Sequence, residues 1–259
     1  PVTQNSIALY VVHFVSYLLP LLTVPYLARV LKPHAVGVLA LCQAVTTWTA
    51  VLIEYGMVLS ASRAIAQARD DPRALAKLVS AVSAAKLCLP LLSLAVPLSL
   101  WFAHATFRQQ PNLLWWAWLG SAGIGMSPLW YFQGVERLKV PAILEISIKG
   151  VAVAGIFIFV RSQHDVWKAM AVQSLGFASA SAILTILMLR EVRYRTPPIR
   201  EVFKVLREGA WIFTYRVGTS LYTSANLLII GFFAPAAAVG FYAYGEKLRS
   251  VITNLLWPC

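Results

Sequence analysis

The stretch NSIALYVVHFVSYLLPLLTVPYLARVLKPHAVG, from Asn5 to Gly37, contains the pattern that decides the fold. Its segment Ser6–Ala28 runs for 23 residues without Lys, Arg, Asp or Glu. Because a helix rises about 1.5 Å per residue, this segment is long enough to cross a hydrocarbon core of about 30 Å. A turn at Pro33 to Gly37 follows, and a second apolar run begins at once. The pattern predicts two consecutive transmembrane helices.

Two prolines, Pro20 and Pro25, lie inside the first apolar segment. Each proline lacks a backbone N–H and frees a carbonyl that lipid cannot satisfy. A simple lipid anchor has no need of them. They indicate a helix of a polytopic membrane protein that changes conformation.

The composition of the whole chain agrees with a membrane protein. Its 259 residues are 59% apolar and only 12% charged, and the mean hydropathy is +0.70. A soluble domain carries about 25% charged residues. The formal net charge of +12 comes mostly from short loops between apolar runs, and no nucleic-acid-binding motif accompanies it. We therefore expect no nucleic-acid partner.

Seven full apolar spans and an eighth can be placed along the chain. They cover residues 6–28, 35–59, 78–102, 112–133, 140–160, 166–189, 210–233 and 236–257. The connections after spans two, four and six hold twelve basic residues, against five in or directly beside the connections after spans one, three and five, where Lys168 is counted at the start of span six. Basic residues accumulate in cytoplasmic loops, so the pattern predicts a cytoplasmic N-terminus.

These spans predict an all-α, polytopic transmembrane helix bundle made of one six-helix lobe and the first two helices of a second. Residues 1–189 form the N-terminal lobe, 190–208 a cytoplasmic basic amphipathic linker, and 209–259 the start of a truncated C-terminal lobe. The linker carries an apolar stripe that we expect to lie on the inner membrane surface, formed by Val202, Val205 and Leu206.

Two short segments with weak sequence similarity to each other support the prediction of two related lobes. RVLKPHAVGVLAL, around Val36-Gly37, matches GFFAPAAAVGFYA, around Val239-Gly240. This alignment pairs spans one and two with spans seven and eight, as expected for the repeated units of secondary transporters.

Charged and polar groups inside the spans are the candidates for function, because burying them in lipid is costly. The candidates for substrate binding are Arg216, Lys247, Arg249 and Asn226. The candidates for coupling or gating are Glu54, Lys86, Glu145 and Lys149. Guanidinium and ammonium groups suit a phosphate-bearing ligand. Two purely structural alternatives remain open: Glu145 and Lys149 neutralise each other, and a Glu246–Arg249 pair locks two helices together.

Signals of catalysis and of cofactor binding are lacking. The sequence has no GxxxxGK[ST] loop, GxSxG elbow, HExxH helix or CxxC pair. The three cysteines and four histidines are scattered, without the spacing of a metal site. We expect no catalytic residues, no metal and no cofactor.

Three stretches resemble the polysaccharide transporters, or O-antigen flippases, of the multidrug/oligosaccharidyl-lipid/polysaccharide exporter superfamily. They are the opening stretch, WYFQGVERLK from Trp130 to Lys139, and REGAWIF…SLYTSANLLIIGFFAPAAAVGFYAYGEKL from Arg207 to Leu248. The resemblance extends over the chain from end to end. It implies two six-helix lobes that alternately open to either side of a bacterial inner membrane.

The resemblance also implies a function: transport of an undecaprenyl-pyrophosphate-linked oligosaccharide from the cytoplasmic to the periplasmic face. The implied partners are that lipid-linked oligosaccharide, membrane lipids, and a polysaccharide polymerase with its chain-length machinery. Members have about twelve or more spans, so the chain is expected to be a fragment or a truncated gene product. Two alternatives remain open: a drug/cation antiporter of the same superfamily, and a membrane glycosyltransferase or polymerase of the same pathway.

Overall fold

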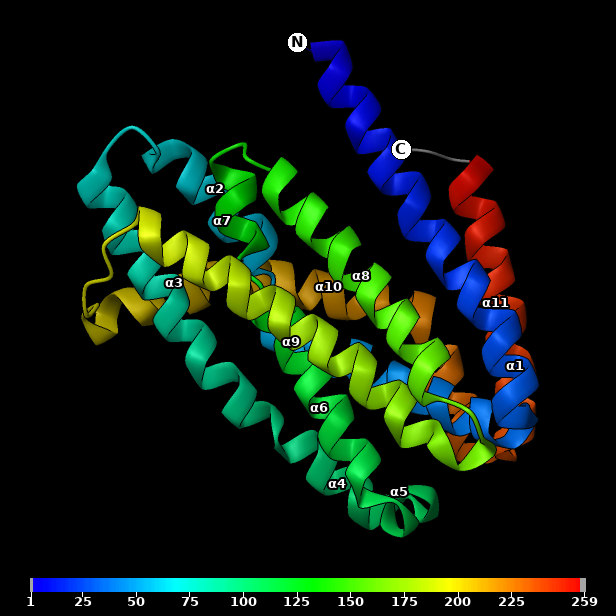
Figure 1. The fold of residues 1–259 in the computed structure, drawn as a ribbon. Coiled ribbons are helices and arrows are strands. Elements are labelled where there is room, and N and C mark those ends of the chain that lie inside the picture. Colours follow the sequence, from blue (N-terminus) through cyan, green and yellow to red (C-terminus); the bar gives the residue numbers. More distant parts are fainter. Residues whose placement is uncertain (1, 257–259) are drawn as a thin grey trace.

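The computed structural model describes the backbone of residues 2–256 and the side chains of 22–221, 226–247, 249 and 253. Within these residues the elements are all helical (Figure 1). They are α1 (Val2–Glu54), α2 (Met57–Ala68), α3 (Pro72–Ser93), α4 (Ala95–Ala103), α5 (Ala105–Gln109), α6 (Pro111–Met126), α7 (Leu129–Gly134), α8 (Lys139–Phe159), the 3₁₀ turn η1 (Gln163–Asp165), α9 (Val166–Glu191), α10 (Ile199–Phe233) and α11 (Ala236–Leu256).

Over the described residues the eight predicted spans coincide with helices apart from short breaks, and the all-α membrane bundle is confirmed. α1 contains span one and most of span two, which ends in α2, and its non-helical residue is Lys32 (φ 62°, ψ 162°) rather than either proline. Span three is divided between α3 and α4, and span four between α6 and α7. Four stretches of the described chain are long and apolar enough to cross a membrane: Leu22–Ala68, Pro72–Ala103, Lys139–Phe159 and Gln163–Glu191.

The buried apolar residues form two cores at opposite ends of the bundle. One core, at the Gly37 end, joins the middle of α1 to α5, α6, α8 and α9, and includes Leu31, Phe107 and Met170. The other, at the Gly56 end, joins α2, α3, α7, α9 and α10, and includes Ile65 and Trp130.

The two segments that echo each other in sequence lie face to face at the Gly37 end. There α11 runs alongside the first half of α1 (Figure 1). A Cβ atom on Gly37 would lie 1.6 Å from Ala236 O and 3.1 Å from Gly240 N. A Cβ atom on Gly240 would lie 3.1 Å from Gly37 N. Only glycine permits this reciprocal approach, which is the arrangement expected of two units related by a local two-fold axis.

The predicted amphipathic stripe faces protein rather than lipid. Residues 199–208 are the first turns of α10, which continues unbroken to Phe233. Val205 is buried in the core at the Gly56 end, and Val202 and Leu206 pack against it. Because α2 and α3 supply an apolar surface, the stripe gains more by packing than by lying on a membrane.

The connection between α8 and α9 is fixed by one carboxylate. Asp165 accepts hydrogen bonds from Ser162 N at 2.9 Å and Arg161 N at 3.1 Å, and forms an ion pair with Lys168 at 2.6 Å. The Lys168 ammonium, together with these donors, holds the pKa of Asp165 well below its usual range.

Candidate functional site

A cavity of about 590 Å³, here called the main cavity, lies between α1, α6, α8, α9 and α11. Its walls are largely apolar, with Leu27, Ile156 and Phe177 among them. Its charged lining side chains in the described chain are Glu145, Lys149 and Lys247, a net charge of +1. It is therefore an apolar chamber with a small number of cationic groups.

A chain of polar side chains crosses one side of the main cavity. Lys247 Nζ of α11 donates to Gln43 Oε1 of α1 at 3.1 Å. Gln43 Nε2 in turn donates to Gln173 Oε1 of α9 at 2.7 Å. This relay, Lys247–Gln43–Gln173, joins three helices and fixes the ammonium at the cavity wall. It satisfies amide groups that apolar surroundings would otherwise leave unpaired.

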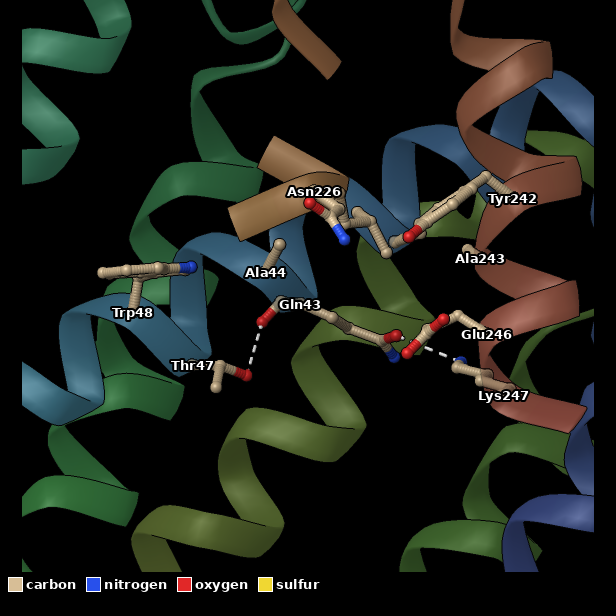
Figure 2. Close-up of a pocket in the computed structure, with 11 residues that line it drawn as sticks. Gln43, Ala44, Thr47, Trp48, Asn226, Tyr242, Ala243, Glu246 and Lys247 are labelled. Carbon is tan, nitrogen blue, oxygen red and sulfur yellow. Dashed lines mark hydrogen bonds between the residues drawn. The ribbon is translucent and has the colours of Figure 1, made fainter. Parts of the chain in front are cut away.

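A smaller hollow of about 220 Å³, here called the side pocket, lies on the other side of Gln43 and Lys247. Its polar and aromatic lining comes from Gln43, Thr47, Trp48, Asn226, Tyr242, Glu246 and Lys247. Figure 2 shows these side chains converging from α1, α10 and α11. Gln43 and Lys247 line both hollows, so the relay forms the wall between them.

The predicted cargo residues separate into two places. Lys247 and Asn226 line the side pocket. Arg249 forms an ion pair with Glu246 three residues earlier on the same helix, so that pair does not lock two helices together. Arg216 is not among the described residues that line either hollow. It forms an ion pair with Glu54, in which Arg216 Nη1 lies 3.4 Å from Glu54 Oε2.

Glu54 lies at the junction of three segments at the Gly56 end. It is 8% exposed, and its carboxylate accepts from Val58 N at 2.6 Å and Gly56 N at 3.3 Å. It thus pairs with the positive N-terminus of α2 as well as with Arg216. Gly56 has φ +71°, and a Cβ atom there would lie 2.8 Å from Phe213 N of α10. The Glu54–Arg216 pair therefore ties the turn between α1 and α2 to α10.

The remaining gating candidates have different surroundings. Lys86 is 3% exposed, and its ammonium donates to Gly125 O at 2.7 Å and Ser127 O at 3.1 Å. It caps the C-terminus of α6, where the break before α7 leaves carbonyls without helical partners. Glu145 and Lys149 form the predicted in-helix pair at 2.6 Å, and both line the main cavity.

Several lining residues were not predicted from the sequence. Gln43, Gln173, Trp48 and Tyr242 are uncharged, so the pattern of charged residues within the spans does not indicate them. A signal was available for the two glutamines, because an amide inside an apolar span must find a partner. Among the described residues no group of three or more His, Cys, Asp or Glu side chains is arranged to hold a metal ion.

Comparison with known proteins decides the family. The model of the family described as polysaccharide biosynthesis protein matches residues 2–259. The chain belongs to this family. The family assignment agrees with the resemblance on which the sequence interpretation relied.

Two curated relatives are similar to this member of the family. A protein of Escherichia coli K12 named "Putative O-antigen transporter" is 29% identical over 257 residues, and one of Shigella dysenteriae with the same name is 28% identical over 261. Both alignments include 98% of this chain, which spans 62% and 64% of the lengths of these relatives. No solved structure matches the chain.

Proposed function

We propose that this chain is part of a flippase that moves an undecaprenyl-pyrophosphate-linked oligosaccharide across a bacterial inner membrane by alternating access. The observation that carries the proposal is the main cavity, an apolar chamber among long apolar helices with the Lys247 ammonium held on its wall. The family and the names of the two relatives agree with transport of a polysaccharide precursor.

The charge in the cavity suits an anionic cargo. Pyrophosphate is multiply anionic at neutral pH, and an ammonium in a site of low dielectric attracts it more strongly than the same ammonium in water. Lys247 is held by Gln43, so part of the entropy of ordering it is lost before the cargo arrives. We assign Lys247 and Asn226 to the cargo, and Glu145 and Lys149 to a pair that opens and closes beside it.

The other predicted residues act elsewhere in this proposal. The Glu54–Arg216 ion pair holds the turn between α1 and α2 against α10 at the Gly56 end, and it breaks when the two lobes move apart. Lys86 stabilises the break between α6 and α7. The Gly56 end faces the cytoplasm, in keeping with the basic residues of its loops. A drug/cation antiporter would need an excess of carboxylates in the cavity, and the described lining has two lysines and one glutamate.

Reversal of the Lys247 charge tests this function in cells. In a strain that depends on this protein for its surface polysaccharide, we expect Lys247→Glu to abolish the polysaccharide while the amount of protein in the membrane stays normal. Lys204→Glu is the matched control, because Lys204 is exposed on α10 outside both hollows, and we expect it to leave polysaccharide unchanged. Normal polysaccharide with Lys247→Glu would refute the assignment of the cavity.

A further inference from the structure

The side pocket contains a hydrogen-bond donor that the fold does not use. Trp48 Nε1 is buried and has no hydrogen-bond partner among the described residues. Figure 2 shows the nitrogen edge of this indole turned toward Ala44 and Asn226. A buried unpaired donor costs about 1–3 kcal/mol, so such a group indicates a ligand that pairs with it.

The remaining lining narrows the chemistry of that ligand. Figure 2 shows Trp48 on one side of the Asn226 amide, and the Tyr242 ring and the Glu246 carboxylate on the other. This combination supplies an apolar ring face together with both donors and acceptors. A sugar ring presents the same combination, with C–H groups on its faces and hydroxyl groups around its edge.

The charges argue against a cation as the occupant. Glu246 is already paired with Arg249, and the Lys247 ammonium lies on the same wall of the pocket. A cation drawn to the aromatic faces would meet this ammonium and a carboxylate that is already neutralised. The size also fits a small neutral group, since about 220 Å³ is below the range of roughly 300–1,000 Å³ that drug-sized ligands occupy.

We propose that the side pocket is a sugar subsite, in which one ring of the cargo stacks on Trp48 and bonds to its indole N–H and to Asn226. This inference rests on the proposed function, because the sugar arrives attached to the pyrophosphate. Lys247 and Gln43 line both hollows, so a phosphate at Lys247 places the first sugar within reach of the side pocket. The subsite gives the protein a means to distinguish a loaded lipid carrier from an empty one.

Two lipid probes separate the subsite from the phosphate site. One is undecaprenyl pyrophosphate without sugar, and the other is the same lipid with its oligosaccharide, extracted from cells that make the polysaccharide. Their Kd values are measured with the purified protein in nanodiscs. Wild-type protein binds the sugar-bearing lipid more tightly. Trp48→Leu raises the Kd of that lipid about tenfold, which is the loss of about 1.4 kcal/mol, and leaves the Kd of the sugar-free lipid unchanged.

Two further variants sharpen the result. Trp48→Phe keeps a ring face but removes the N–H, and we expect an intermediate effect of about threefold on the sugar-bearing lipid alone. Trp211→Leu is the control, because Trp211 is 83% exposed on α10, and we expect it to change neither Kd.

The possible failures have different meanings. If Trp48→Leu changes neither Kd, or weakens both equally, the sugar subsite is wrong although the flippase proposal stands. Equal binding of both lipids by the wild-type protein also overturns the subsite. If the wild-type protein binds neither lipid, the proposed function itself fails, and the sugar subsite fails with it.

Discussion

The ion pair between Glu54 and Arg216 supports a quantitative prediction about how α10 is fastened to α1 and α2. At the observed 3.4 Å, two unit charges interact by about 1 kcal/mol at the dielectric constant of water and by about 5 kcal/mol at an effective value of 20. The Arg216 side chain is 39% exposed and that of Glu54 10%, so solvent screens the pair in part. We expect a coupling energy of about 1–2 kcal/mol.

A double-mutant cycle measures this energy. The free energies of unfolding of wild type, Glu54→Gln, Arg216→Gln and the double variant are compared in mixed micelles. Glu54→Gln alone should cost about 2–3 kcal/mol, because two backbone N–H groups also lose a charged acceptor. The pair Glu145–Lys149 provides the control cycle, since the Glu145 side chain is 59% exposed against 10% for Glu54, and an in-helix pair contributes about 0.3–0.5 kcal/mol.

The outcome separates a structural Arg216 from one that contacts cargo. A coupling energy below about 0.3 kcal/mol, combined with weaker cargo binding by Arg216→Gln, would refute the fastening role. Arg216 would then be a cargo ligand, as the sequence predicted. A coupling within the expected range, with cargo Kd unchanged in Arg216→Gln, supports the assignment made from the structure.

Three other predictions concern the framework around the site. Gly37→Ala should lower the free energy of unfolding by about 1–3 kcal/mol, because its methyl group meets the backbone of α11, whereas Gly218→Ala, with open space around it, should be neutral or stabilising. Lys86→Met should cost about 1–3 kcal/mol by leaving carbonyls of the α6 terminus unpaired, with cargo Kd unchanged; an unaltered unfolding free energy would contradict the capping role. Because the pKa of Asp165 is depressed in the folded state, its carboxylate stabilises the fold at pH values above the ordinary carboxyl pKa near 4. The loss of stability in Asp165→Asn should therefore be full at pH 7 and shrink as the pH falls below about 4. A loss that is constant from pH 7 to pH 3 would contradict this role of the carboxylate.

The membrane fold could be predicted from the sequence because its cause is local. A run such as 6–28 has to form a helix in lipid, since no other structure satisfies its backbone. The similarity around Gly37 and Gly240 predicted repeated units, and in the structure the backbones at these two glycines pack against each other. The division of the chain into lobes at 190–208 stays a prediction.

The candidate site was only partly predictable. Charge and depth singled out Lys247, which lines the main cavity, but they could not indicate that Arg216 would meet Glu54, which is distant in the chain. The relay through Gln43 and Gln173 depends on the packing of α1 against α9 and α11. A one-dimensional pattern contains no information on such pairings, because they are set by which helix faces come together.

Translocation in proteoliposomes tests the central claim most directly. Lipid-linked oligosaccharide with a fluorescent label is placed in the membrane, and the fraction that becomes accessible to an added quencher is followed over time. The membrane protein that contains this chain should accelerate the exchange, and Lys247→Glu should reduce it to the rate of protein-free vesicles, while Lys204→Glu leaves it unchanged. Exchange at the wild-type rate with Lys247→Glu would contradict the account.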